Sequence, residues 1–206
     1  MGSRVKMKKM TAFSAIISLV SFLYKMGMGI YNLSLVLMVA SLSTLMVFIC
    51  KVAFVKAITK TREKKKRNYL IMVVATFIYS LIFLLFVVLK VFNIDISKEN
   101  TLTGWLGALF ILFVLVMFIL SVINLKGALE KTDIMVIGLK EITFVSALTD
   151  LIIIEEFALM IYLRYQEMND IVSMIDKYLP LGISVLMLLV SIFMFIRYVR
   201  YSTDNK

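Results

Sequence analysis

Three carboxylates stand close together in a stretch of sequence that is otherwise almost entirely apolar. They are Asp150, Glu155 and Glu156, within segment 134–163. An ionised carboxylate in the middle of a bilayer costs about 2.5–3.5 kcal/mol even on a lenient insertion scale, so it must face protein or water, pair with a cation, or hold a proton. Lys90 lies near the end of another apolar segment and offers a counter-charge at matching depth. These residues predict a proton or cation pathway through Asp150, Glu155, Glu156 and Lys90.

A structural interpretation of the same residues is also open. Asp150 and Glu155 are separated by five positions, which places them about 140° apart around a helix. The acids therefore do not form one cluster on their own helix. Lys90, Lys25 or neighbouring hydroxyl groups could satisfy them and hold this segment in the centre of a bundle.

The residue types exclude most kinds of catalysis. The chain has no His and one Cys, which excludes a Cys/His zinc site and His-based acid–base chemistry. Glu155-Glu156 resembles the paired glutamates of the CAAX-type intramembrane proteases, whose motif is EExxxR with His residues on later helices. Here Met160 occupies the Arg position. There is also no glycine-rich loop for a phosphate. We predict that the chain is not an enzyme and has no metal or cofactor.

The composition indicates a polytopic membrane protein. Hydrophobic residues make up 62% of the chain, charged residues 17%, and the mean hydropathy is +0.98. A soluble domain is about half apolar and a quarter charged. A membrane-spanning helix needs about 20 mostly apolar residues. We predict a single transmembrane domain, residues 1–206, as an all-α bundle of six helices at 11–28, 31–57, 68–92, 103–124, 134–163 and 178–200.

The distribution of Lys and Arg predicts the orientation of the bundle, because short loops rich in these residues stay cytoplasmic. Loop 58–67 carries six basic residues against Glu63, whereas loops 93–102 and 164–177 are each net −1. Both termini are then cytoplasmic, in a bacterial inner membrane. The alternative is a five-span protein in which 11–28 is an interfacial helix.

The basic loop itself predicts a contact surface. Clusters of four to eight Lys or Arg beside a membrane helix attract anionic lipids. The residues expected to contact anionic lipid or a partner are Lys60, Arg62, Lys64, Lys65, Lys66 and Arg67. No aromatic residues or motifs accompany them, so we predict no nucleic-acid partner. A homo-oligomer or a membrane partner protein remains open.

The order of predicted helices and loops suggests two halves of three helices each. The second helix of each half carries a similar string, ASLSTL at 40–45 and VSALTD at 145–150. An odd number of spans per half gives the halves opposite orientations, as in the inverted repeats of secondary transporters. Pro180 is expected in the first turn of its helix, where proline is tolerated. Gly104 and Gly107 are expected to allow close helix packing.

Together these features predict a small transporter or channel-like permeation protein for an ion or small solute, using intramembrane carboxylates. The alternative is a non-catalytic membrane subunit or scaffold that assembles with partner proteins or binds anionic lipid. A pathway requires an acid that titrates, and Asp150 is the best candidate because it is the deepest of the three. A scaffold needs these acids only as structural partners of a buried cation.

Overall fold

The computed structural model describes residues 2–31, 35–92, 105–129, 133–165 and 169–203, and in these ranges it contains six α-helices and no strand. Long apolar segments favour helices because a helix makes all its backbone hydrogen bonds within the segment, as a bilayer requires. The helices are α1 (Gly2–Tyr31), α2 (Leu35–Ala57), α3 (Arg62–Val91), α4 (Trp105–Leu129), α5 (Ile134–Tyr165) and α6 (Asp170–Thr203).

Two helices begin at side-chain caps. The backbone N–H of Met135 donates to the Asp133 carboxylate at 3.1 Å, and that of Val172 donates to the Asn169 side chain at 2.9 Å. Such caps satisfy N–H groups that have no partner within the helix. The cap at Asn169 lets α6 begin well before the expected start at 178. The expectation for Pro180 was therefore wrong, because this proline lies inside α6 rather than in its first turn.

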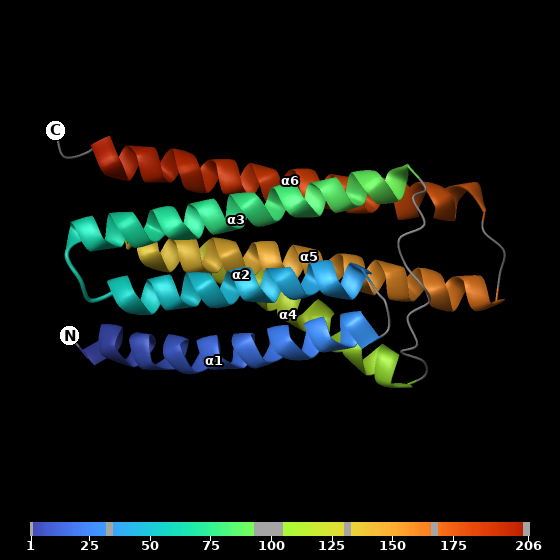
Figure 1. Cartoon of the computed structure of the whole chain (residues 1–206), viewed down its shortest axis with the longest axis horizontal. Helices are drawn as coiled ribbons and strands as arrows, with labels where there is room; N and C mark the ends of the chain where they lie inside the picture. The colour runs from blue at the N-terminus through green and yellow to red at the C-terminus, as the bar shows by residue number, and fades with distance from the viewer. Residues whose placement is uncertain (1, 32–34, 93–104, 130–132, 166–168, 204–206) are drawn as a thin grey trace.

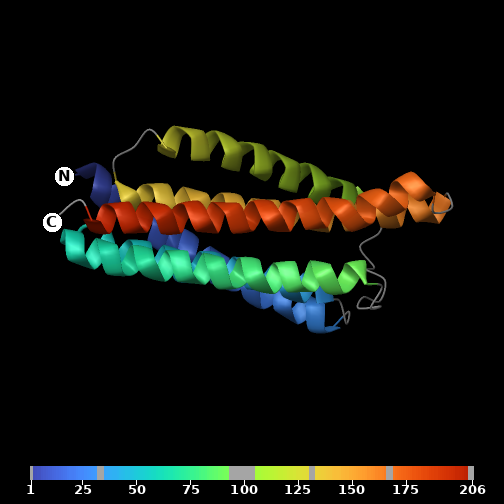
Figure 2. The ribbon, with the colours of Figure 1, turned by 90° about the horizontal axis from the view of Figure 1, so that it is seen from above.

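Successive helices run in opposite directions, as Figure 1 shows. Both termini and the turn between α2 and α3 lie at the same end of the bundle, which we call the basic end (Figure 1, left). Among the described residues, α5 is the central helix and packs against α2, α3, α4 and α6. In contrast, the described part of α1 packs along α2 alone at one edge of the bundle (Figure 1), and that of α4 packs along α5 alone at another edge (Figure 2). The helix expected at 11–28 is therefore present as part of α1, and it runs antiparallel to α2.

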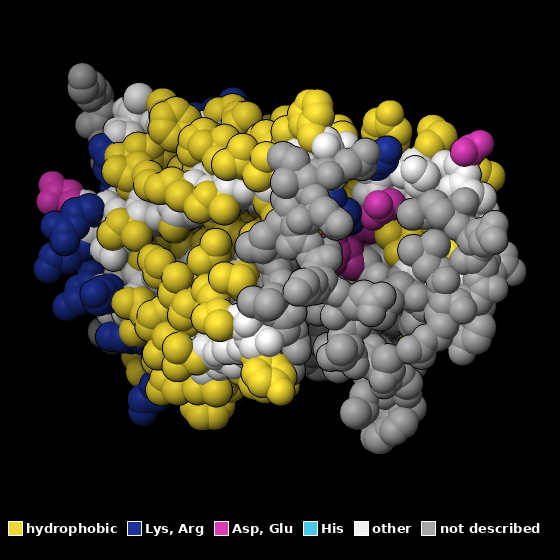
Figure 3. Space-filling view, turned by 45° about the vertical axis from the view of Figure 1, so that its right-hand side comes forward, with side chains coloured by type: hydrophobic (Ala, Val, Ile, Leu, Met, Phe, Trp, Pro, Cys, Tyr) yellow, Lys and Arg dark blue, Asp and Glu magenta, His cyan; other side chains and the backbone are white. Residues whose placement is uncertain are grey.

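The outer surface of the bundle is strongly apolar. On α6 the inward positions recur at intervals of three and four, and they are Pro180, Ile183, Ser184, Met187, Ser191 and Met194. Other faces of α6 expose large hydrophobic side chains such as Leu189, Phe193 and Ile196. Figure 3 shows hydrophobic side chains over much of the middle of the molecule and Lys and Arg gathered at the basic end. Soluble monomers rarely expose such continuous apolar surface.

Four described helices are long and apolar enough to cross a membrane, judged by length and composition. They contain Val5–Tyr31 of α1, Met38–Ala57 of α2, and the whole of α3 and α6. The described apolar part of α4, Phe118–Gly127, is shorter. α5 has the length but carries Asp150, Glu155 and Glu156. The expected helices are thus present, while their number as membrane spans is a separate question.

A first prediction concerns the α3–α5 contact. A Cβ atom at Gly138 would lie 2.5 Å from Cε2 of the fully buried Tyr69 ring. We expect Gly138→Ala to lower the free energy of unfolding by about 1–3 kcal/mol, because the rigid ring has no free space to move into. Gly182→Ala is the matched control, since nothing lies within 4 Å of its Cβ position. Denaturant titration in mixed micelles measures both variants, and equal losses would refute the close contact. The close packing expected at Gly104 and Gly107 lies outside what the structure describes.

Candidate functional site

The acidic residues of α5 face different neighbouring helices, because α5 is central and the acids are spread around it. Asp150 points toward α1, where Lys25 Nζ lies 3.2 Å from its Oδ1 atom. The Lys25 and Asp150 side chains are 20% and 24% exposed. This ion pair agrees with the structural interpretation of Asp150, in which a counter-charge satisfies the carboxylate. The pair also connects α1, at the edge of the bundle, to the central helix α5.

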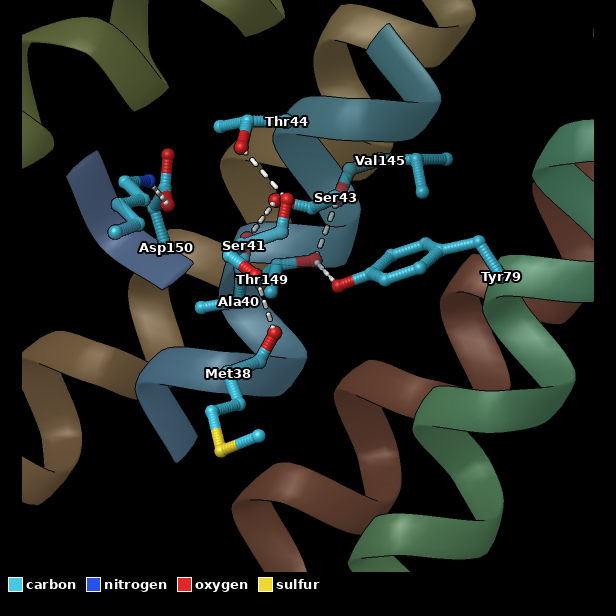
Figure 4. Close-up of polar contacts among 10 residues, drawn as sticks. Met38, Ala40, Ser41, Ser43, Thr44, Tyr79, Val145, Thr149 and Asp150 are labelled. Carbon is cyan, nitrogen blue, oxygen red and sulfur yellow. Dashed lines mark hydrogen bonds and ion pairs between the residues drawn. The ribbon is translucent and has the colours of Figure 1, made fainter. Parts of the chain in front are cut away.

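Four hydroxyl groups near the middle of α5 have hydrogen-bond partners, and they belong to Ser41, Ser43, Tyr79 and Thr149. Figure 4 shows the side chains of Thr149 and Tyr79 pointing toward one another, and their hydroxyl oxygens are 2.9 Å apart. Ser41 and Ser43 of α2 donate to backbone carbonyls of their own helix at 2.6 and 2.7 Å. Because these groups are satisfied inside the bundle, they support packing of α2, α3 and α5 rather than an open binding site.

A second group of charges lies at the end of α3 remote from the basic end. We call it the acidic cluster, and it consists of Lys90, Glu155, Glu156 and Asp176. Lys90 Nζ is 3.2 Å from Glu156 Oε1 and 2.7 Å from Asp176 Oδ1. Glu155 lies near Lys90 without contacting it, so the described residues of the cluster carry one ammonium group and three carboxylates, an excess of two negative charges if all are ionised. Acidic and basic side chains adjoin in this half of the molecule in Figure 3.

Glu155 is the unsatisfied member of the acidic cluster. Its side chain belongs to a residue that is only 7% exposed. Within the described part of the chain, neither of its carboxylate oxygens has a hydrogen-bond partner. It interacts electrostatically with Lys90, Asp176 and Glu156. Burying a charge without a partner costs several kcal/mol, so this position favours binding of a positive species.

Asp176 was not among the expected site residues, because the hydropathy pattern placed it in a loop. Its helical position follows from the early start of α6 at Asp170. Pro180 stands four residues after Asp176 and has no N–H, so it cannot donate the usual helical hydrogen bond to the Asp176 carbonyl oxygen. A proline four residues after an acid is the signal that could have drawn attention to this position.

A third charged group lies toward the basic end. Arg197 Nη1 of α6 donates to Glu141 Oε1 of α5, and Glu141 is only 4% exposed. The second Glu141 oxygen has no hydrogen-bond partner among the described residues. The Tyr69 hydroxyl donates to the Met194 carbonyl oxygen at 3.4 Å, beside this pair. Arg197 falls near the end of the helix expected at 178–200, and the sequence did not indicate its pairing with Glu141.

The six basic residues expected to contact lipid divide into two sets. Three of them fold back on neighbouring helices: Arg62 stacks over Tyr201 at 4.5 Å, Lys65 pairs with Asp133 at 2.7 Å, and Lys66 lies 6.0 Å from the Tyr198 ring centre. The other three are exposed, and they are Lys60, Lys64 and Arg67. The second set is therefore free to contact lipid headgroups. The first set holds the beginning of α3 against α6 and Asp133.

The ligand sets known for metals do not fit the described residues, in which no group of three or more Asp, Glu, Cys or His could hold a metal ion. Comparison with models of protein families, with curated proteins and with solved structures found no match. The function therefore has to be inferred from the geometry of the bundle.

Proposed function

We propose that this chain is a multi-pass inner-membrane protein that carries a cation across the bilayer, with the acidic cluster as the mouth of its pathway. In this proposal all six helices span, and both termini lie in the cytoplasm at the basic end. The four long apolar helices, the apolar outer surface and the antiparallel order of the helices support it. An α5 that crosses the membrane needs its acids covered by other helices, and its central position supplies that cover.

The observation that carries the proposal is the unbalanced charge of the acidic cluster. One ammonium faces three carboxylates, and the Glu155 carboxylate is buried without a partner in the described residues. A purely structural ion pair would be balanced, as Asp150 with Lys25 and Glu141 with Arg197 are. We therefore assign Glu155, Glu156 and Lys90 to the pathway and give Asp150 a role in holding α1 against α5.

The helix contacts support an inverted repeat of α1–α3 and α4–α6. The α1–α2 contact has its counterpart in α4–α5, and α2–α3 in α5–α6. The α2–α5 and α3–α6 contacts join equivalent helices of the two halves. Only α3–α5 has no counterpart among the described residues. Such a repeat places the α2–α5 crossing near the midplane, where transporters with this symmetry have their sites.

The basic end also supports a lipid partner. Lys60, Lys64 and Arg67 are exposed, as are Lys56 and Arg200. Each basic residue near the surface contributes about 1 kcal/mol to attraction toward anionic headgroups. These contacts would hold the basic end at the cytoplasmic surface of the membrane. Lipid binding was also part of the scaffold alternative, and the exposed basic residues support that part of it. Binding to anionic lipid does not require the excess of carboxylates that the acidic cluster has.

A second prediction tests the orientation. In intact cells, a Cys at Gly27 should react with a membrane-impermeant maleimide, and a Cys at the exposed Lys64 should not. The native Cys50 is fully buried and serves as an internal background. Labelling at position 64 from outside would overturn the orientation. Failure to label at both positions would favour five spans.

The third prediction tests the cation pathway. Asp176→Asn removes one excess negative charge, yet Lys90 keeps its contact with Glu156. In proteoliposomes we expect the concentration of the permeating cation at half-maximal flux to rise about threefold to tenfold, because a nearby charge contributes of the order of 1 kcal/mol. Asp170→Asn, an exposed acid in the first turn of the same helix, is the matched control. Equal behaviour of the two variants would remove the cluster from the pathway.

A further inference from the structure

We infer that the cation held at Glu155 is a proton, so that this side chain is a buried carboxylic acid that exchanges its proton during transport. The inference deepens the proposed function and rests on it for the transport step. Glu155 is only 7% exposed, and both of its carboxylate oxygens are without a hydrogen-bond partner in the part of the chain that is described.

The surroundings of Glu155 fit a proton better than a metal ion. Hard cations such as Ca²⁺ and Mg²⁺ are held by six or more oxygen atoms at about 2.0–2.6 Å. No such group of acids occurs among the described residues. The hydroxyl groups of Thr149 and Tyr79 lie nearer the middle of α5 and are engaged with one another. A proton needs no coordination shell, and it neutralises the carboxylate where it stands.

The charges that face Glu155 come from three helices. Among the described residues they are Lys90 of α3, Glu156 of α5 and Asp176 of α6. Lys90 is already engaged by Glu156 and Asp176 at 3.2 and 2.7 Å. Carboxylates that share one site cannot all ionise easily, so the one without an ammonium contact keeps its proton. Glu155 is that residue.

Proton exchange at this position has a simple balance. The O–H bond of the Glu155 carboxyl breaks, its electron pair stays on the carboxylate oxygen, and the proton passes to a water molecule. Lys90 is the only cation of the cluster, so it can then move from Asp176 toward the new carboxylate. Movement of the Lys90 ammonium group toward Glu155 would break its contact with Asp176. Loss of the proton from α5 is thereby coupled to the contact between α3 and α6.

Infrared difference spectroscopy of the full chain in lipid tests this inference independently of flux. At neutral pH we expect the carbonyl stretch of a protonated carboxyl group, which should be lost in Glu155→Gln and kept in Glu156→Gln. Glu155→Asp provides a second variant, in which the band should shift rather than vanish. Replacing potassium with sodium should leave the band unchanged.

Each outcome separates the two proposals. A missing band, a band that survives Glu155→Gln, or a band that disappears on addition of sodium would overturn the proton assignment. If the band is absent while liposomes still conduct a cation, the proposed function stands and only the proton is wrong. If the band behaves as expected but no flux occurs, the proton site stands and the transport function fails.

Discussion

Arg197→Met is expected to lower the free energy of unfolding by about 3–5 kcal/mol, the usual cost of removing one partner of a buried ion pair. Arg197 is the only described cation in contact with the Glu141 carboxylate, whose side chain is 5% exposed. The second Glu141 oxygen has no hydrogen-bond partner among the described residues, and these residues offer no second cation in contact with the carboxylate. Chemical unfolding in mixed micelles measures the change.

Two further variants make the Arg197 result specific. Arg200→Met changes an exposed arginine one turn further along α6 and should alter the stability by no more than about 0.5 kcal/mol. Adding Glu141→Gln to Arg197→Met should recover much of the loss, because it removes the isolated charge. Equal effects of Arg197→Met and Arg200→Met would contradict the inner pair.

Much of the helical pattern follows from local properties of the sequence. The predicted helix at 134–163 corresponds closely to α5, whereas α3 begins at Arg62, so most of the basic stretch expected as a loop at 58–67 is helical. Hydropathy was less informative about helix ends, because charged residues continue a helix beyond its apolar part. α1 therefore includes the basic residues before position 11, and α6 includes residues before 178.

The sequence predicted a charge pair only where both residues were expected at the same depth in the membrane. Lys90 and Glu156 lie at the same end of their helices, and both were expected in one group. Glu141 and Arg197 are 56 positions apart, and their contact depends on how α6 is rotated against α5. A sequence pattern does not specify that rotation: Met187, Ser191 and Met194 of α6 are buried, and Ser191 meets Ser80 of α3 at 3.0 Å.

The distinction between a paired and an unpaired acid also required the structure. Asp150, Glu155 and Glu156 stand in the same apolar stretch, and the sequence does not show which of them has a counter-charge. In the bundle Asp150 meets Lys25 and Glu156 meets Lys90, while Glu155 meets neither at hydrogen-bond distance. Among the described residues, Glu155 is therefore the acid of the three whose carboxylate has no hydrogen-bond partner, and it replaces Asp150 as the first candidate for the pathway.

Glu155→Gln is expected to reduce cation flux in proteoliposomes to the level of protein-free liposomes. Gln has nearly the shape of a protonated Glu, so the fold should persist, but it cannot bind or release a proton or balance a cation. Glu63→Gln is the matched control, because Glu63 is an exposed acid at the basic end. It should conduct as the unmodified protein does.

The most direct measurement is therefore the flux of protons and monovalent cations through liposomes that contain the unmodified protein or Glu155→Gln, with folded protein quantified in the same samples. We expect flux through the unmodified protein and through Glu63→Gln, and none through folded Glu155→Gln. Equal flux through the unmodified protein and Glu155→Gln, or no flux through any of them, would contradict a cation pathway at the acidic cluster.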